Sequence, residues 1–454
     1  MKTDIIGAGI TGLSCAYKLH KAGEEFLVLD KRARVGGVIH TERNQGFLVE
    51  HGPNSLMLDD AEILAYFEEL GLASQIVEAN EKSKNRYIVR DGVPVALPTS
   101  PPSLVTTKAF SFGGKLRLFR EPFIAPLPDD TEHSVASFFK QRFGEEIFTY
   151  AADPFISGVY AGDPEKLSVK HAFPMLVEAE QAHRSVIRGM MKAGKARRQD
   201  PKVIKRKLIS FQNGMASLPL ALLDRIRPGN VQLESDILGI EHQEGGDWKI
   251  TWKHEDGSGA SEDTFQRLVV TSPAYTLPTL PFPAGLSEKF TPMTGIPHPP
   301  IACAALGYKR KQIQHALDGF GMLVPSIEGK NLLGSIFSTT LFPGRAPEGE
   351  VLLQCFIGGA RNPVVQSLSR FDLVELIQPE LARLLGIEGP PNFIQVRKWD
   401  RSIPQANIGH DYYLDILDSI EAEFPTLKLA GNYRTGVSVP HCIHAGWRAA
   451  AQPA

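Results

Sequence analysis

A glycine-rich loop near the start of the chain constrains the fold more than any other feature. The chain reads Asp-Ile-Ile-Gly-Ala-Gly-Ile-Thr-Gly-Leu over residues 4–13, and an acidic residue follows at Asp30. Gly7 would allow a tight turn after a buried strand, Gly9 would let backbone approach a pyrophosphate, and Gly12 would let the next helix pack against that strand. This order predicts a β-α-β unit with a dinucleotide at the N-terminus of its helix.

The residues after the loop complete this unit. Ala22 and Gly23 are suited to end the helix, and the apolar run Phe-Leu-Val-Leu at 26–29 predicts a second buried strand. That strand would deliver Asp30 to a ribose hydroxyl. Because strand, glycines, helix, strand and acid follow in order within about thirty residues, a dinucleotide site is favoured over a glycine-rich turn without a ligand.

The next segment separates a flavin site from a nicotinamide site. Residues 30–37 read Asp-Lys-Arg-Ala-Arg-Val-Gly-Gly. This resembles the E-x-x-x-R-x-G-G extension of FAD-dependent amine oxidase-like proteins, with Asp in place of the usual Glu. Arg34 can offset pyrophosphate charge, and Gly36 with Gly37 lets backbone pass close to the cofactor. The segment therefore favours FAD over an exposed basic turn.

Length and composition fit an enzyme of several domains. The chain has 454 residues, a net charge of −2 and an apolar fraction of 43%, which suggests about three domains and gives no reason to expect nucleic acid as a partner. Its four cysteines form no C-x-x-C pair, so neither a metal site nor a disulfide framework is expected. No apolar run is long enough to span a membrane, and the first strand leaves no room for a signal peptide, so we expect a cytoplasmic protein.

Two segments are basic although the net charge of the whole chain is close to zero. Residues 183–207 carry ten Lys and Arg against one acid, Asp200, and residues 110–123 interleave bulky apolar with basic side chains. Leu116, Phe119 and Phe123 would share one helical face. Together these segments suit peripheral association with the inner face of an anionic membrane. The alternative is a solvated basic helix beside an ordinary amphipathic core helix.

Later segments return to the cofactor domain. Residues 211–219 and 231–240 read as loop, helix and strand, and a hairpin around Trp248 and Trp252 precedes a buried strand at 268–271. Near the end of the chain, residues 427–440 read as strand, glycine turn and helix start. The backbone amides there suit an anion or the carbonyl edge of a flavin ring.

Several motifs together identify a family. They are the segments 7–13, 50–55 (Glu-His-Gly-Pro-Asn-Ser), 85–87 (Asn-Arg-Tyr), 157–163 (Ser-Gly-Val-Tyr-Ala-Gly-Asp), 178–185, 319–325, 356–359 and 430–432. On these motifs the chain resembles the oxygen-dependent protoporphyrinogen oxidase family nearly from end to end. The first and last motifs are shared with amine oxidases and carotenoid desaturases, whereas the middle ones are more particular.

The resemblance implies an activity without a nucleophile or an acid-base residue. Protoporphyrinogen IX would be oxidised to protoporphyrin IX in haem biosynthesis, in three two-electron rounds in which FAD is reoxidised by dioxygen and hydrogen peroxide is released. The protein would chiefly position the macrocycle against the flavin N5. By likeness to the family, Arg86 would bind a propionate, Gly158 would approach the pyrrole nitrogens, and the macrocycle would be held by Phe320, Leu323, Ile336 and Phe356.

The resemblance also extends the set of expected FAD contacts. The full set is Gly7, Gly9, Ile10, Thr11, Gly12, Asp30, Lys31, Arg34, Gly36, Gly37, Gly52, Pro53, Asn54, Ile237, Trp399, Gly431, Asn432, Val437, Ser438 and Val439. Two positions depart from the family: Ile336 stands where plant members have leucine, and Asn54 stands where some members have arginine or aspartate.

Three alternatives remain open. A coproporphyrinogen III oxidase would act on a four-propionate ring, for which Arg90, Lys309, Arg310, Arg345 and Arg361 are further cationic candidates. A flavin amine oxidase would need an aromatic cage and usually a lysine near N5. A catalytically silent flavin- or porphyrin-binding escort would normally have lost some motifs.

The expected architecture is α/β and discontinuous, of the amine oxidase and p-hydroxybenzoate hydroxylase type. A Rossmann-like FAD-binding domain would comprise residues 1–84, 206–271 and 399–454, and a mixed-sheet α+β substrate domain residues 85–96 and 272–398. A helical, membrane-associating insertion would span 97–205. The sequence leaves the oligomeric state open, with a homodimer as one alternative.

Overall fold

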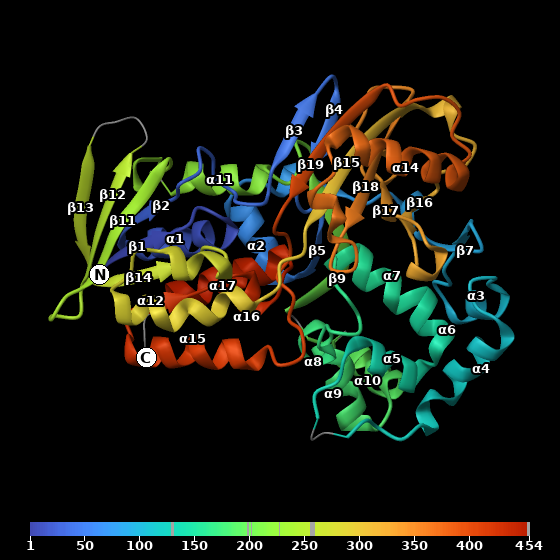
Figure 1. Cartoon of the computed structure of the whole chain (residues 1–454), viewed down its shortest axis with the longest axis horizontal. Coiled ribbons are helices and arrows are strands. Elements are labelled where there is room, and N and C mark those ends of the chain that lie inside the picture. Colours follow the sequence, from blue (N-terminus) through green and yellow to red (C-terminus); the bar gives the residue numbers. More distant parts are fainter. Residues whose placement is uncertain (129–130, 198, 201, 227, 255–258, 452–454) are drawn as a thin grey trace.

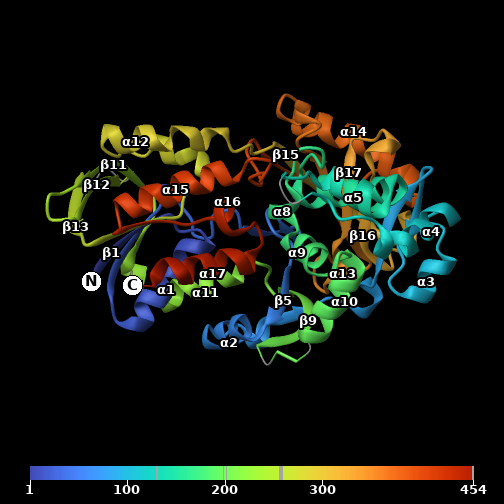
Figure 2. The same cartoon turned by 90° about the horizontal axis from the view of Figure 1, so that it is seen from below.

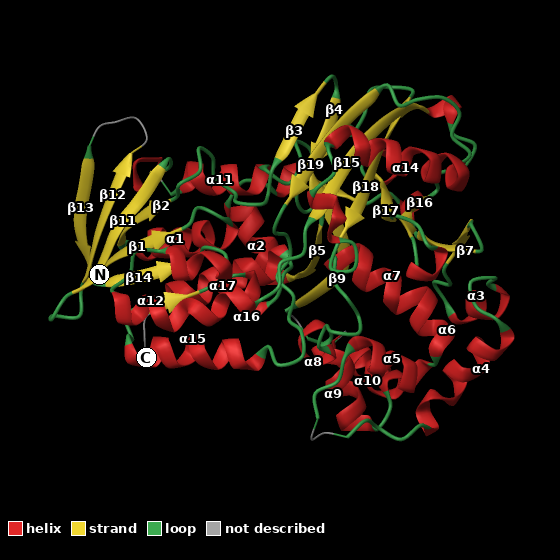
Figure 3. Cartoon of the chain, in the orientation of Figure 1, coloured by secondary structure: helices red, strands yellow, loops and turns green. Residues whose placement is uncertain are grey.

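The computed structural model describes residues 1–451 except for 129–130, 198, 201, 227 and 255–258. Two sheets lie at opposite ends of the molecule, and a group of helices lies below the second sheet (Figure 1). Among the described residues of this group, Figure 3 shows helices and loops but no strands. Arg198, part of the predicted basic run, lies outside the described residues.

The first sheet is parallel and five-stranded, in the order β10-β2-β1-β14-β20. Its strands are β1 (Lys2–Ile6), β2 (Glu25–Leu29), β10 (Val231–Gln232), β14 (Arg267–Val270) and β20 (Leu427–Leu429). The buried apolar strands thus come from the beginning, middle and end of the chain. This is the discontinuous Rossmann-like arrangement that the sequence predicts.

Helices cover one face of this sheet. They are α1 (Ile10–Ala22), α2 (Ala61–Glu69), α11 (Ser217–Arg225) and α17 (Val439–Ala450), with α16 (Asn432–Thr435) leading into the last. Gly23 ends α1 in the left-handed conformation, at φ 72°. Figure 2 shows α17 beside α1, and Gly446 is required there because a Cβ would lie 2.2 Å from the Thr11 carbonyl oxygen.

An antiparallel layer covers the opposite face. It consists of β11 (Ser235–His242), β12 (Trp248–His254) and β13 (Ala260–Phe265), followed by α12 (Ala284–Phe290) and, much later, α15 (Asp411–Glu423). Trp248 and Phe265 are fully buried in its core together with Leu277 and Phe290. The predicted substrate domain begins at residue 272, whereas residues 274–296 pack into this core. Their short turns carry no periodicity that assigns them to one domain.

The second sheet is mixed and seven-stranded, in the order β19-β15-β18-β17-β16-β7-β8. Its strands are β7 (Asn85–Arg90), β8 (Val93–Ala96), β15 (Ile301–Lys309), β16 (Gly319–Leu323), β17 (Leu332–Phe337), β18 (Glu350–Gly358) and β19 (Phe393–Trp399). The β7–β16 pair is parallel and the other pairs are antiparallel. The helix α14 (Arg370–Leu385) buries its apolar side chains on one face, which leaves the other face toward the rest of the molecule.

Smaller elements join the two ends. They are the hairpin β3 (Thr41–Asn44) and β4 (Phe47–Glu50), the sheet β5 (Leu56–Asp60), β9 (Val203–Phe211) and β6 (Ile76–Glu78), and α13 (Ser338–Leu341). The strand β9 takes up the second half of the predicted basic run. Lys207 in this strand pairs with Glu78, and Arg197 at the end of α10 (Val186–Arg197) pairs with Asp59.

The helical group contains α3 (Pro101–Thr106), α4 (Phe112–Arg120), α5 (Val135–Phe143), α6 (Glu145–Ile147), α7 (Asp153–Phe155), α8 (Val169–Ala172), α9 (Pro174–His183) and α10 (Val186–Arg197). Two π-helical segments, Phe148–Ala152 and Ile156–Tyr160, flank α7. Phe123 lies outside α4, because α4 ends at Arg120 and a 3-10 turn containing Pro122 follows. The fully buried pair Glu121–Arg142 ties this turn to α5.

None of the helices in the described part of the chain is both long and apolar enough to cross a membrane.

Candidate active site

The glycine loop forms the tight turn that its sequence predicts. Gly7 has φ 112°, a value that favours glycine, and a Cβ on Gly12 would lie 1.9 Å from the Gly7 carbonyl oxygen. A Cβ on Gly9 would meet no atom within 4 Å. Gly7 and Gly12 are therefore required by the turn and its packing, whereas Gly9 faces open space that a ligand can use.

The N-terminus of α1 fits an anion. Its N-cap residue is Gly9, which offers no side chain to the first-turn N–H groups. Ile10 and Thr11, the first helical residues, are buried. Because uncapped N–H groups and the helix dipole both favour negative charge, this end of α1 suits a pyrophosphate.

Asp30 lies at the edge of the loop. Its Oδ2 accepts the N–H of Ala8 at 2.7 Å and its Oδ1 accepts the N–H of Arg32 at 2.8 Å. These bonds fix the carboxylate beside the loop and still leave lone pairs for a ribose hydroxyl. Lys31, the neighbouring predicted contact, is exposed.

The turn that follows packs directly against the loop. Gly36 has φ 95°, donates its N–H to the Ala8 carbonyl at 2.8 Å and bridges to Gly9. A Cβ on Gly37 would lie 3.2 Å from the Cα of Gly9. The Arg34 guanidinium binds three carbonyls of this turn, including that of Gly37 at 2.8 Å. Arg34 thus shapes the backbone that borders the loop.

Three further predicted contacts come from the segment after β4. A Cβ on Gly52 would lie 2.0 Å from the Val38 carbonyl oxygen, so the two backbones touch. Pro53 and Asn54 are half-buried, and Trp399 donates its indole N–H to the His51 carbonyl at 2.9 Å. Trp399 therefore joins these residues, although they are far apart in the sequence.

The remaining predicted cofactor contacts lie in β11, in α16 and at the start of α17. Ile237 lies at a register shift of β11 and packs against the domain core. Gly431 is the N-cap residue of α16, and Asn432 begins that helix. Val437 precedes α17 and Val439 begins it, and the Ser438 hydroxyl caps α17 by accepting the His441 N–H at 3.2 Å. Since α17 packs on α1, this segment lies close to the glycine loop.

A hydrogen-bond network centred on Glu50 is not predicted by the sequence, although Glu50 begins the motif at 50–55. Its carboxylate accepts the Met215 N–H at 2.9 Å and the Thr41 hydroxyl at 2.6 Å, and its carbonyl accepts the Gln354 amide at 3.2 Å. Burial raises the pKa of Glu50 to about 7. Because Gln354 lies on β18, this network joins the cofactor segments to the second sheet.

Four predicted substrate contacts share the face of that sheet opposite α14. Gly334 pairs with both Leu323 and Phe356, and Ile336 lies two residues further along the same strand. Ile88 pairs with Leu323 and lies two residues after Arg86. Since side chains alternate along strands, Leu323, Phe356, Ile336 and Arg86 point to one side.

The two remaining substrate contacts touch this group. Phe320 lies in an irregular stretch of β16, and its ring centroid is 5.2 Å from the Cζ of Arg86. Gly158, from the second π-helical segment, packs so closely that a Cβ would lie 2.5 Å from Cδ2 of Leu323. The structure therefore brings all six predicted substrate contacts together.

Four of the five additional cationic candidates bind groups within the protein. Arg90 pairs with Glu146 at 2.8 Å, Arg361 with Asp153 at 2.6 Å, and Arg345 with the Ser210 hydroxyl at 2.6 Å. Arg310 donates to the carbonyls of Ile313 and His315. Lys309 is exposed at the end of β15. These arginines are thus already committed to structural contacts.

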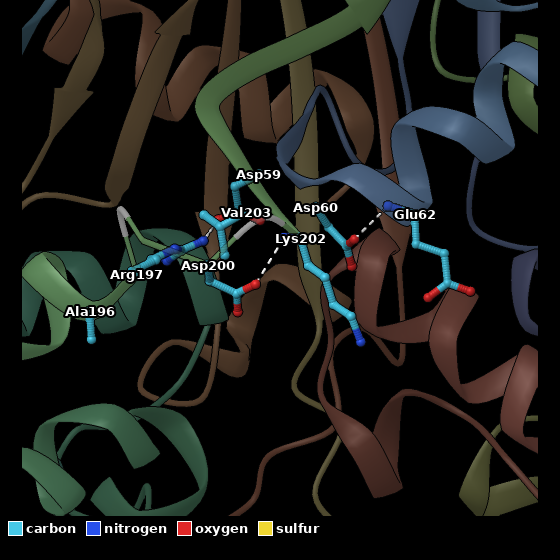
Figure 4. Close-up of a pocket in the computed structure, with 8 residues that line it drawn as sticks. All are labelled: Asp59, Asp60, Glu62, Ala196, Arg197, Asp200, Lys202 and Val203. Atoms are coloured by element: carbon cyan, nitrogen blue, oxygen red, sulfur yellow. Dashed lines mark hydrogen bonds and ion pairs between the residues drawn. The ribbon is translucent and has the colours of Figure 1, made fainter.

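A separate hollow of about 830 Å³ lies between the start of α2 and the end of α10 (Figure 4). Its lining carries both signs of charge, including Asp59, Asp60, Arg197 and Lys202. None of the predicted site residues lines it. Within the described residues, no group of three or more His, Cys, Asp or Glu side chains could hold a metal ion.

Comparisons with known proteins agree with this architecture. Residues 10–452 match the family described as flavin containing amine oxidoreductase. Protoporphyrinogen oxidase 2 of Arabidopsis thaliana is 31% identical, over 98% of this chain and 92% of the relative. Coproporphyrinogen III oxidase of Bacillus subtilis is 26% identical, over 97% of this chain and 95% of the relative.

A solved structure confirms the predicted fold class. A protoporphyrinogen oxidase candidate from Exiguobacterium superposes with a TM-score of 0.80 at 21% identity, covering 99% of this chain and 97% of the other. The prediction of FAD is confirmed by the family match, and the open space at Gly9 with the uncapped α1 fits such a dinucleotide. The chain therefore belongs to the flavin containing amine oxidoreductases and, within them, to the protoporphyrinogen oxidase family.

Proposed function

We propose that this flavin-dependent oxidoreductase oxidises protoporphyrinogen IX to protoporphyrin IX, with dioxygen as the electron acceptor and hydrogen peroxide as the second product. The observation that carries the proposal is the position of Arg86. Its guanidinium lies over the Phe320 ring on the sheet face that also bears Leu323, Ile336 and Phe356. A guanidinium beside a broad apolar surface suits an apolar macrocycle with a carboxylate at its edge.

The protein's residues would bind and orient this substrate. Bound FAD supplies the hydride acceptor for each two-electron step. Arg86 would hold a propionate, and the Phe320 ring would support its guanidinium by stacking against it. Leu323, Ile336 and Phe356 would contact one face of the macrocycle and exclude water from it, and Gly158 would approach with bare backbone.

The charge around this face favours the two-propionate substrate over coproporphyrinogen III. A four-propionate ring calls for more cations, yet Arg90, Arg345 and Arg361 each bind a partner in the protein. Releasing Arg361 would leave the carboxylate of Asp153, 3% exposed, without a counter-charge, which is costly. Identity to the plant enzymes is also higher than to the Bacillus subtilis enzyme.

The test compares both porphyrinogens with the purified flavoprotein under air. We expect fluorescence to rise faster with protoporphyrinogen IX, together with consumption of dioxygen and formation of peroxide. Faster oxidation of coproporphyrinogen III would assign the four-propionate ring instead. If neither substrate is oxidised, the proposal is wrong.

An exposed apolar and basic surface supports a peripheral membrane location. Phe112 is 82% exposed, Phe119 63% and Phe123 81%. Arg188 lies over the Phe123 ring, and Arg120 and Lys192 are also exposed. Exposed phenylalanines beside cations suit the headgroup region of an anionic bilayer better than water. A porphyrin-type substrate could then be exchanged near the membrane.

A further inference from the structure

The carboxylate of Asp153 joins three separate segments of the chain. Asp153 begins α7, between the two π-helical segments, and its side chain is only 3% exposed. Its Oδ2 accepts the backbone N–H of Ser326 at 2.9 Å and the Ser326 hydroxyl at 2.7 Å. Its Oδ1 accepts the Arg361 guanidinium at 2.6 Å, and that guanidinium also donates to the Ser326 hydroxyl at 3.2 Å.

Each of these segments carries one of the proposed substrate contacts. Ser326 follows β16, three residues after Leu323, and Arg361 follows β18, five residues after Phe356. Gly158 lies five residues after Asp153, within the next π-helical segment. One carboxylate thus links the helix that bears Gly158 to the ends of two strands that bear its opposing side chains.

A backbone bond reinforces the same junction. Ala360, beside Arg361, donates its N–H to the carbonyl of Ala161 at 2.8 Å, just beyond the π-helical segment. Within the helix, the Ser157 hydroxyl donates a hydrogen bond to the Asp153 carbonyl at 3.0 Å. The segment from Asp153 to Ala161 is therefore held at both of its ends by residues that follow β16 and β18.

We propose that Asp153 is a positioning residue that, through Ser326 and Arg361, sets the distance between the Gly158 backbone and the Leu323–Phe356 face. This inference rests on the proposed function, in which the macrocycle contacts both Gly158 and the Leu323–Phe356 face. Gly158 and Leu323 already approach so closely that a Cβ would not fit. A small movement of the helix would therefore displace Leu323 and change the surface that the two residues present to the substrate.

The pairing is suited to fix position as well as to satisfy charge. Arg361 is one-third exposed while Asp153 is buried, so this ion pair connects a residue at the surface to a carboxylate in the interior. Charge-assisted bonds are short and directional, and the partners of one carboxylate must move together. π-Helical segments concentrate at functional sites, and here two of them flank the carboxylate.

The variants separate positioning from general stability. Asp153→Asn removes the charge with little change in volume, and Arg361→Gln removes the other partner. Arg361→Lys keeps a cation that can still donate to Asp153. Glu121→Gln is the matched control, because Glu121 forms a fully buried carboxylate–guanidinium pair with Arg142 in the same helical group without contacting the second sheet.

Kinetics and hydrogen exchange give independent results. We expect kcat/KM for protoporphyrinogen IX to fall roughly tenfold or more in Asp153→Asn and Arg361→Gln, mostly through KM, at unchanged flavin content. Arg361→Lys should recover part of the loss, and Glu121→Gln should keep the wild-type KM. Amide exchange in Asp153→Asn should accelerate together at 154–162, 324–328 and 358–361.

Each outcome has one meaning. A wild-type KM in Asp153→Asn, or exchange that rises equally across the chain, would overturn the positioning role. An equal rise of KM in Glu121→Gln would reduce the effect to general destabilisation and also overturn it. If the wild-type protein oxidises no porphyrinogen, the proposed function fails, while the exchange experiment still decides whether Asp153 couples the three segments.

Discussion

The guanidinium of Arg86 lies over the ring of Phe320, with Cζ 5.2 Å from the ring centroid. The Arg86 side chain reaches solvent, and its guanidinium donates one long hydrogen bond, of 3.4 Å, to the Lys84 carbonyl. Partial burial and the nearby Arg206 lower the pKa of Arg86. A carboxylate would relieve both penalties, so the pair is suited to receive an anionic group.

Replacing Arg86 with Ala should therefore weaken substrate binding. A charge-assisted hydrogen bond contributes about 1.5–3 kcal/mol, so KM for protoporphyrinogen IX should rise roughly ten- to a hundredfold while kcat changes little. Arg90→Ala is the control, because Arg90 is already paired with Glu146 and should lower stability instead. The measurement is steady-state fluorimetry, and an unchanged KM in Arg86→Ala would assign the propionate to another residue.

Gly158→Ala should impair the enzyme through Leu323. The added Cβ would lie 2.5 Å from Cδ2 of Leu323, so one of the two must move. We expect kcat/KM to fall roughly tenfold or more, since small misplacements in a site cost that much. Leu323→Ala in the same chain should restore part of the activity by making room. Equal losses in the single and double variants would show that the contact is not the cause.

The local motifs of the cofactor site were predictable from the sequence, whereas its long-range pairings were not. The turn at Gly7 and Gly36, the position of Asp30 and the capping of α1 by Gly23 all follow from spacing within about forty residues. Backbone geometry at these positions demands particular residue types. A single sequence therefore reveals them.

The pairings of Glu50 and Asp153 depend on residues hundreds of positions away. Nothing in the spacing indicates that Gln354 will reach the Glu50 carbonyl, or that Arg361 will pair with Asp153. The six substrate contacts were named through family likeness, and only the register of the second sheet explains why they meet. Likewise, only the packing of residues 274–296 in the core around Trp248 reveals that this segment belongs to the cofactor domain.

Glu50 should make stability depend on pH. Burial raises its pKa from 4.5 to about 7, so the folded protein binds this proton more tightly than the unfolded chain does. The proton's contribution is fully present below about pH 4.5 and is lost as the pH rises to about 7, with a change of roughly 3 kcal/mol. Glu50→Gln keeps an acceptor for Met215 but cannot ionise.

Urea unfolding at several pH values checks this expectation. Between about pH 5 and pH 8, the wild-type protein should lose more stability than Glu50→Gln, whose curve should be flatter by roughly 3 kcal/mol. The difference between the two proteins isolates Glu50 from other titrating groups. Parallel curves would mean that Glu50 ionises as easily in the folded protein as in the unfolded chain.

The exposed phenylalanines of the helical group should determine membrane binding. The wild-type protein should sediment with anionic phospholipid vesicles, and less so at high salt, because screening weakens the attraction of Arg120 and Arg188. The triple variant Phe112→Ser, Phe119→Ser, Phe123→Ser should bind at least roughly tenfold more weakly, since each buried Phe side chain contributes about 1.5–3 kcal/mol. Phe371→Ser is the matched control, because Phe371 is 71% exposed on α14, outside the helical group. Retention of the triple variant on vesicles, or equal loss in Phe371→Ser, would show that these phenylalanines are solvated side chains without a role in docking.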